Sequence, residues 1–216
     1  LLGQKLAIAT SKPGTTRSVL LGVYVQQDPP TQIAFIDTPG MHRPHNALGR
    51  ALVEDAKAGL ASADVIVFVT EIGKQGGRLT FPVPGDAEIL EQLRDFKGKV
   101  VLVINKVDRL KEKALLLPLI ERASKAFDFA AVVPVSALRK DNMDSLVRAL
   151  REQLPEGLAY DPEMLTDKPQ RFFASELIRE AVLTQTHEEV PHGVAVLVER
   201  FEEGKELYRI GATIVV

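Results

Sequence analysis

Val100-Val101-Leu102-Val103-Ile104 runs directly into Asn105-Lys106-Val107-Asp108. The first segment is apolar and mostly β-branched, which predicts a strand buried in a sheet. The segment that follows is polar except for Val107, so we expect the chain to leave the sheet at Asn105. In open parallel sheets, ligands bind at the carboxyl ends of the strands. This strand end is therefore a candidate binding site.

The spacing of the polar residues in this loop, Asn-Lys-x-Asp with Val107 at x, suits recognition of guanine. The Asp108 carboxylate would accept hydrogen bonds from N1–H and the exocyclic amine of guanine, a pair of donors that adenine lacks. Asn105 would tie neighbouring loops together, and the aliphatic stem of Lys106 would lie over the base. A site built for such donors strongly rejects a base without them. Taken alone, the motif also fits a surface turn after any strand.

A second strand, residues 32–36, ends in Asp37-Thr38-Pro39-Gly40. An acidic side chain at a strand end can hold Mg²⁺, usually through water. Gly40 has no Cβ, so its N–H can approach a γ-phosphate closely. We therefore expect a phosphate and Mg²⁺ site at this strand end.

A third apolar strand, residues 131–135, ends in Ser136-Ala137-Leu138. Backbone amides in this loop would complete the base site. All three motifs follow strands that helical patterns separate, so we expect them at one edge of one sheet. Their order favours a nucleotide site over three unrelated turns.

The composition is that of a globular protein, with 216 residues, 45% hydrophobic and 26% charged, and a net charge of −2. There are no cysteines, which excludes disulfides and thiolate metal sites and suits a reducing cytoplasm. No apolar run approaches the length that crosses a bilayer, and we expect no secretory leader. The charge balance neither supports nor excludes binding to nucleic acid.

Apolar strands alternate with amphipathic helices along most of the chain, which predicts an α/β fold with a doubly wound sheet and helices on both faces. The expected strands are residues 6–9, 19–25, 33–36, 65–69, 100–104 and 132–135, and the expected helices are 47–61, 86–96, 111–127 and 143–154. Asn142 is the expected N-cap of the last helix, and residues 73–77 are an expected flexible loop. After Gly157 the order changes to a helix (170–186) and two strands (194–201 and 207–216), which indicates a smaller α+β domain.

Four blocks together resemble the TrmE–Era–EngA branch of bacterial GTPases. They are Ser11-Lys12-Pro13-Gly14-Thr15-Thr16-Arg17 and the motifs that begin at Asp37, Asn105 and Ser136. The tail narrows the resemblance to the Era family, through Leu165-Thr166-Asp167-Lys168-Pro169-Gln170-Arg171-Phe172-Phe173-Ala174-Ser175-Glu176-Leu177-Ile178-Arg179-Glu180, Glu189-Val190-Pro191-His192 and Val198-Glu199-Arg200-Phe201.

The resemblance implies a Ras-like P-loop GTPase domain over residues 1–157, a linker over 158–165, and the N-terminal part of a KH-type RNA-binding domain over 166–216. Such a protein is a slow GTPase that binds GTP or GDP with Mg²⁺, binds small-subunit ribosomal RNA and assists assembly of the 30S ribosomal subunit. We expect a cytoplasmic monomer, and a peripheral association with the inner membrane stays open.

The resemblance also implies roles for single residues. Thr15 or Thr16 would be the switch-one threonine that meets Mg²⁺, and Thr16 and Asp37 are our candidate metal residues. Asp37 and Gly40 would form the switch-two sensor of the γ-phosphate, and Thr38, Pro39 and Met41 beside them are candidate nucleotide-binding residues. These loops would be ordered by the γ-phosphate and Mg²⁺ and released on hydrolysis.

Two departures from the family pattern matter. No G-x-x-x-x-G-K-[ST] motif occurs, and the family would place it just before Leu1, so we expect these residues alone to bind GTP poorly. Met41 stands where Ras-type enzymes carry the glutamine that orients water, and its thioether is a poor hydrogen-bonding group. We therefore assign no catalytic base. At the other end, we expect the G-x-x-G loop with which a KH domain grips nucleic acid to lie beyond Val216.

Three alternatives remain open. One alternative to an Era-like protein is an EngA- or TrmE-like GTPase, for which the match of the tail would be a coincidence. Another is a non-catalytic interaction module that lacks the phosphate loop. Within the tail, Arg171 and Arg179 face RNA or belong to a plain solvated surface, because Glu176 and Glu180 lie close in the sequence.

Overall fold

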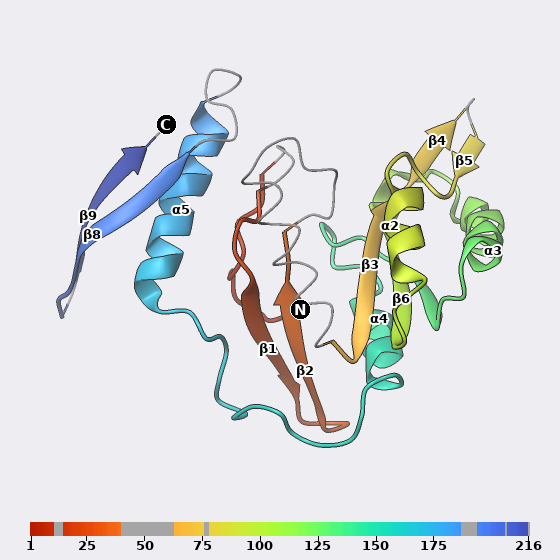
Figure 1. Ribbon diagram of the computed structural model, residues 1–216, viewed down its shortest axis with the longest axis horizontal. Coiled ribbons are helices and arrows are strands. Elements are labelled where there is room, and N and C mark those ends of the chain that lie inside the picture. The colour runs from red at the N-terminus through yellow and green to blue at the C-terminus, as the bar shows by residue number, and fades with distance from the viewer. Residues whose placement is uncertain (11–14, 40–62, 76–77, 187–193, 206, 216) are drawn as a thin grey trace. The chain divides into compact units, whose positions relative to one another are not determined.

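The computed structural model describes residues 1–10, 15–39, 63–75, 78–186, 194–205 and 207–215 (Figure 1). The chain separates into two compact units, one made of Leu1–Gly59 with Leu158–Val216 and the other of Leu60–Gly157. We call them unit 1 and unit 2 and describe each by itself. No helix in the described part of the chain is long and apolar enough to cross a membrane.

Unit 2 is built on a parallel sheet in the order β3-β6-β7. Its strands are β3 (Val65–Glu71), β6 (Lys99–Asn105) and β7 (Ala131–Pro134), and a hairpin of β4 (Gly73–Gln75) and β5 (Arg78–Thr80) follows β3. The helices are α2 (Asp86–Leu93), α3 (Leu116–Ala126) and α4 (Met143–Arg151), with the short 3₁₀ turns η1 (Val107–Arg109) and η2 (Lys113–Leu115). Figure 1 shows α2 beside β3 and β6, and α3 lies near β5 and also contacts β7.

The central strand β6 is buried on both faces, as its continuous apolar sequence predicts. On one face, Leu102 and Ile104 join a hydrophobic core with residues of α2 and α3. Val101 and Val103 are also buried, and they point to the opposite face because side chains alternate along a strand. This packing fixes the carboxyl end of β6, and with it the position of the loop that begins at Asn105.

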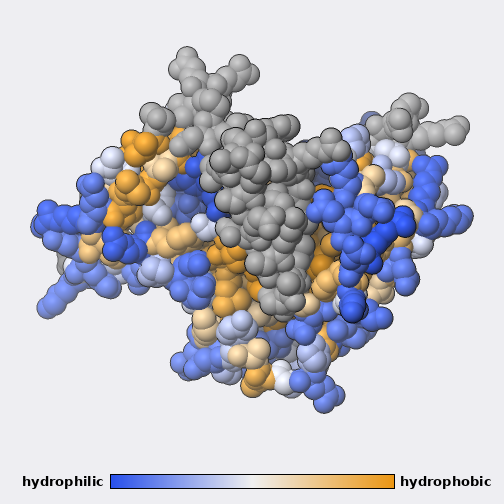
Figure 2. All heavy atoms as spheres, in the orientation of Figure 1, coloured by the Kyte–Doolittle hydropathy of each residue, from blue (hydrophilic) through white to orange (hydrophobic). Residues whose placement is uncertain are grey.

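In its described residues, unit 1 contains two antiparallel pairs and one helix. The strands β1 (Leu20–Gln26) and β2 (Thr31–Asp37) pair with each other, as do β8 (Ala195–Glu203) and β9 (Tyr208–Val215). The helix α5 (Gln170–Gln185) packs against β8. Figure 2 shows hydrophobic residues at the surface over β8 and β9, where Leu197, Ile210 and Ile214 are 43–57% exposed.

The segment expected to be a linker makes specific contacts within unit 1. The Gln32 side chain accepts from the backbone N–H of Ala159 and Tyr160 (2.9 and 3.0 Å) and donates to the Tyr160 carbonyl (2.8 Å). The Val23 N–H donates to the Leu165 carbonyl at 2.8 Å. Residues 158–165 are therefore hydrogen-bonded to the β1–β2 pair. The domain boundaries at residues 157 and 165 remain a prediction from the sequence.

Three local predictions were wrong. Residues 6–9 form no strand within the described chain, and residues 73–75 are strand β4 of a hairpin instead of a flexible loop. Asn142 precedes α4 but its side chain makes no capping bond, because it adopts a left-handed conformation (φ 63°) and donates instead to the Pro134 carbonyl. The helix predicted over residues 47–61 lies outside the described residues.

Candidate functional site

Asn105 joins two loops at the carboxyl edge of the unit 2 sheet. Its side-chain oxygen Oδ1 accepts from the backbone N–H of Lys106 at 2.7 Å and from that of Ala137 at 3.0 Å. Lys106 follows β6 and Ala137 follows β7, and these strands are neighbours in the sheet. Asn105 thus ties neighbouring loops together, as its position in the motif predicts.

Asp108 meets the second of these loops through Ser136. The Ser136 hydroxyl donates to Asp108 Oδ1 at 2.5 Å, and Ser136 itself is fully buried. This hydrogen bond is the main cause that holds the pKa of Asp108 below its ordinary value, with help from the nearby charges of Arg139 and Arg109. The carboxylate at this strand end is therefore ionised near neutral pH and acts as a charged acceptor.

Lys106 adopts a left-handed conformation (φ 64°, ψ 30°), which turns the chain sharply out of β6. Its ammonium pairs with Glu71, the last residue of β3, and this bond lowers the pKa of Glu71. Both side chains are exposed, so the pair contributes at most about 1 kcal/mol to stability. Glu71 was missed in the sequence, because its place beside Asn105 comes from the pairing of β3 with β6 in the folded chain.

The remaining residues of the two loops are less buried. Val107 begins the turn η1, and its N–H donates to the Val135 carbonyl at 3.2 Å. Leu138 is 86% exposed beyond Ala137. Ser136 and Asp141 exchange two backbone hydrogen bonds (3.0 and 3.2 Å), which closes the loop after β7. The loop is therefore rigid at Ser136 and open at Leu138.

In unit 1, Thr16 lies beside Asp37 at the end of β2. The Thr16 hydroxyl donates to Asp37 Oδ2 at 3.3 Å. Neighbouring atoms displace part of the water around the carboxylate even though the residue is exposed, and this desolvation raises the pKa of Asp37 while the Thr16 bond opposes the shift. The Thr15 hydroxyl shares a hydrogen bond with the Thr10 hydroxyl at 2.7 Å instead. The two threonines thus differ, and the hydroxyl of Thr16 is the one next to the carboxylate.

The rest of the expected switch-two segment is only partly described. Thr38 is half-buried and Pro39 is fully buried. Gly40 and Met41 lie outside the described residues, as do residues 11–14. Among the residues that the structure describes, no group of three His, Cys, Asp or Glu side chains surrounds a common point. Asp37 and Thr16 fit Mg²⁺ as a partial set of oxygen ligands, of the kind that water and phosphate complete.

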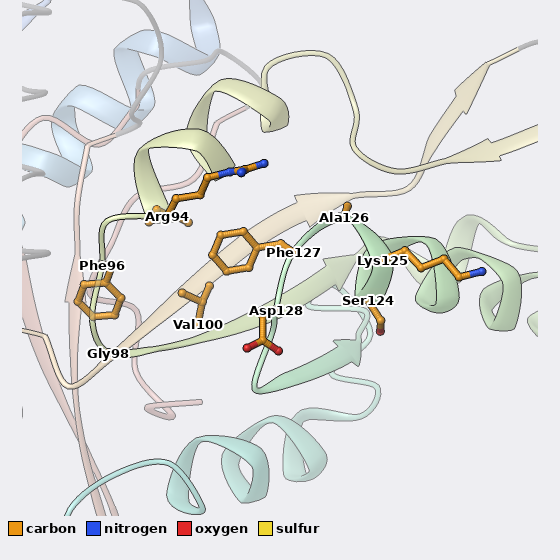
Figure 3. Close-up of a pocket in the computed structure, with 10 residues that line it drawn as sticks. Arg94, Phe96, Gly98, Val100, Ser124, Lys125, Ala126, Phe127 and Asp128 are labelled. Atoms are coloured by element: carbon orange, nitrogen blue, oxygen red, sulfur yellow. The ribbon is translucent and has the colours of Figure 1, made fainter.

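A pocket of ≈ 540 Å³ lies elsewhere in unit 2 (Figure 3). It is lined by the chain between α2 and β6 and by the end of α3, including Phe96, Val100 and Phe127. Val100 is near the amino end of β6, whereas Asn105 ends the strand. Ligands of parallel sheets bind at the carboxyl ends, so this pocket is distinct from the site of the sequence motifs.

Comparison with known proteins agrees with this geometry. Residues 14–156 match the family described as the elongation factor Tu GTP binding domain. Over 216 residues the chain is 40% identical to the GTPase Era of Clostridioides difficile (strain 630), a match that spans 99% of this chain and 70% of that protein. The chain belongs to the Era family of GTPases. Its tail is included in that match, which disfavours an EngA- or TrmE-like assignment.

Two solved Era structures resemble the chain over nearly its whole length. One is Era in complex with MgGDPNP and nucleotides 1506–1542 of 16S ribosomal RNA, with 35% identity, a TM-score of 0.88, and coverage of 99% of this chain and 71% of that one. The other is a substituted Era of Aquifex aeolicus bound to GDP and AlF₄⁻, with 35% identity, a TM-score of 0.86, and coverage of 100% and 72%. The α/β fold predicted from the alternating strands is confirmed.

Proposed function

We propose that this chain works as an Era-type GTPase, a switch that binds GTP and GDP with Mg²⁺, hydrolyses GTP slowly, and binds small-subunit ribosomal RNA to assist assembly of the 30S subunit. The observation that carries the proposal is the joining of the β6 and β7 loops by Asn105, Asp108 and Ser136. A non-catalytic interaction module would have no reason to hold an ionised carboxylate in this frame.

The guanine base is proposed to bind between these loops. Asp108 accepts the two guanine N–H donors, while Ser136 fixes the direction of its carboxylate. Asn105 holds the Lys106-Val107 and Ala137-Leu138 segments at one spacing, so that backbone amides and the Lys106 stem meet the base. This preorganisation is what makes the discrimination strong, because the acceptor is already aimed before the base arrives.

The phosphate end is proposed to bind at Thr16 and Asp37. Mg²⁺, when bound, neutralises charge on the phosphates and orients them for in-line attack. Asp37 would hold a water molecule bound to Mg²⁺, and the Thr16 hydroxyl would be the switch-one ligand. The backbone carbonyl of Thr15 is the alternative switch-one ligand. Thr38, Pro39, Gly40 and Met41 would sense the γ-phosphate, and Met41 leaves water to be positioned by other groups.

Asp37→Asn in the full-length protein should raise the Mg²⁺ concentration needed for half-maximal GTP hydrolysis by about 10- to 100-fold, in the range found for residues that orient a metal. The raised pKa of Asp37 adds a pH signature. As pH falls through that pKa the carboxylate is protonated, so wild-type Mg²⁺ affinity should weaken at a higher pH than for an aspartate with an ordinary pKa. Steady-state hydrolysis at several Mg²⁺ concentrations and pH values measures both effects.

Asp28→Asn is the matched control for this experiment, because Asp28 is exposed in the turn between β1 and β2, at the opposite end of this hairpin from Asp37. Its Mg²⁺ dependence should equal that of the wild type. An Asp37→Asn variant with the same Mg²⁺ requirement as Asp28→Asn would remove Asp37 from the metal site.

The RNA-binding part of the proposal concerns residues 166–216, as the beginning of a KH-type domain. It is supported by the structural match to the Era–RNA complex, which covers 99% of this chain. The full-length protein with a non-hydrolysable GTP analogue should bind an RNA of the sequence 1506–1542 of 16S ribosomal RNA more tightly than a scrambled RNA of equal length. Fluorescence anisotropy measures this, and equal affinity for both RNAs would reject sequence-specific binding.

A monomeric state in the cytoplasm and a peripheral contact with the inner membrane also remain proposals. Sedimentation velocity tests the first, with a dimer at micromolar concentration as the contradicting result. Co-sedimentation with vesicles of bacterial lipid tests the contact, which absence of the protein from the vesicle pellet would reject.

A further inference from the structure

Arg179 is a charged residue in the interior of unit 1. It is 3% exposed in α5, and its guanidinium grips Glu176 one turn earlier with two bonds, from Nε to Oε1 at 2.8 Å and from Nη2 to Oε2 at 2.5 Å. The sequence left open whether this arginine faces RNA or plain solvent, and the structure shows neither. A bidentate pair of this kind is directional and holds the guanidinium in one plane.

The same guanidinium reaches the switch-one segment. Nη2 of Arg179 also donates to the carbonyl of Thr15 at 2.8 Å, across 164 positions of sequence. That carbonyl belongs to the peptide that leads to Thr16, whose hydroxyl donates to Asp37. Arg179 therefore fixes one side of the peptide that carries the candidate Mg²⁺ ligand.

Two further contacts hold this part of the chain to the tail. Arg17 donates from Nη1 to the carbonyl of the buried Val194, just before β8, at 2.6 Å. Glu180, next to Arg179 in α5, accepts from the Ala9 N–H at 3.0 Å and pairs with Lys5. The chain on both sides of Thr15 and Thr16 is thus attached to α5 or to the start of β8.

The charged pair formed by Arg179 and Glu176 is not an arrangement that maximises stability. Nη1 of Arg179 is buried and has no hydrogen-bond partner among the residues that the structure describes, and unmet buried donors are costly. Buried ion pairs can often be replaced by apolar residues without loss of stability. A role in geometry explains the arrangement better than a role in stability.

We propose that Arg179 is a positioning residue of the GTPase site, which sets the carbonyl of Thr15 and thereby aims the Thr16 hydroxyl at Asp37. The inference rests on the proposed function. It makes helix α5, at the start of the proposed RNA-binding segment, part of the Mg²⁺ site. By linkage, a shift of α5 and the binding of Mg²⁺ then affect each other.

The test uses the full-length protein with Arg179→Lys and the double variant Arg179→Met with Glu176→Met. Lysine keeps the charge but lacks the fork that bridges Glu176 and Thr15, and the double variant removes the buried pair as a whole. Arg171→Lys is the matched control, since Arg171 lies in the same helix and donates only to the Val198 carbonyl among the contacts described, at 2.6 Å. The readouts are Mg²⁺ dependence of GTP hydrolysis, GDP affinity in EDTA, and the midpoint of thermal unfolding.

Both Arg179 variants should need about tenfold more Mg²⁺ for half-maximal hydrolysis, as for other residues that orient a metal ligand. GDP affinity in EDTA should match the control in both variants, and the unfolding midpoint should match it in the double variant, which leaves no buried charge unpaired. Unchanged Mg²⁺ dependence would overturn the inference. Variants that do not fold would also overturn it, as would variants whose GDP affinity in EDTA falls as much as their Mg²⁺ dependence changes, because Arg179 would then support the fold and not the Mg²⁺ site. A wild type without Mg²⁺-dependent GTP hydrolysis would instead reject the proposed function itself.

Discussion

Asp108→Asn is expected to weaken GTP binding by roughly 10²- to 10⁴-fold and to shift preference toward xanthine nucleotides. The variant loses two hydrogen bonds to a charged acceptor, each worth about 1.5–3 kcal/mol. Its amide N–H₂ would also face the exocyclic amine of guanine, donor against donor, whereas the carbonyl of xanthine accepts from it. Competition of GTP and XTP against a fluorescent GDP analogue measures both changes in one titration.

Asp95→Asn is the control for charge, because Asp95 is exposed in the same unit and belongs to neither loop. Its affinity for GTP should stay within about twofold of the wild-type affinity, because surface substitutions away from a site usually have small effects. Retention of guanine preference by Asp108→Asn would show that another group reads the base.

Asn105→Ala is expected to loosen both loops of the base site. The N–H groups of Lys106 and Ala137 lose their shared acceptor. Because Ala137 is exposed, water can accept from these groups and recover part of the lost hydrogen-bond energy. We expect unfolding of the protein to become easier by about 1–2 kcal/mol and GDP affinity to fall by about 10- to 100-fold. Urea unfolding and GDP titration of the same samples give the two values.

Asn142→Ala provides the contrast. Asn142 bonds the Pro134 carbonyl after β7 and has φ 63°, so alanine there is strained and stability falls. GDP affinity should nevertheless persist, since the bonds of Asn105 are intact. Equal losses of affinity in the two variants would mean that Asn105 acts through general stability and does not organise the base site.

The strands of unit 2 were predictable because their sequences are continuous and β-branched. Residues 65–69, 100–104 and 132–135 fall within or overlap β3, β6 and β7, and the motifs at Asn105 and Ser136 follow β6 and β7 as predicted. The motif at Asp37 follows β2, which among the described strands pairs with β1 in a separate sheet, so it does not share one sheet edge with the other two. Helix ends were less accurate. The helix expected over 86–96 is α2, Asp86–Leu93, because Gly98 and the turn before it lead back into β6.

Local rules failed where a distant partner competed with them. Asn142 is a good N-cap residue by type, yet the Pro134 carbonyl takes its side chain. Gly73 sits in a glycine-rich segment that indicates a loop, yet it pairs with Thr80 in a hairpin. Neither partner is visible to a rule that reads a few residues at a time.

The residues missed in the site have the same explanation. Glu71 lies 35 positions from Lys106, and Arg179 lies 164 positions from Thr15. Motifs identify groups that touch a ligand, because the ligand fixes their type and spacing. Groups that touch those groups have no fixed spacing, so only the folded chain reveals them.

The most direct test of the guanine site is calorimetric titration of the full-length protein with GDP and with ADP, in the same Mg²⁺ buffer. The frame made by Asn105, Asp108 and Ser136 predicts binding of GDP and affinity for ADP lower by at least about 10³-fold, because adenine leaves the Asp108 carboxylate unpaired. Equal affinity for the two nucleotides, or binding of neither, would contradict it.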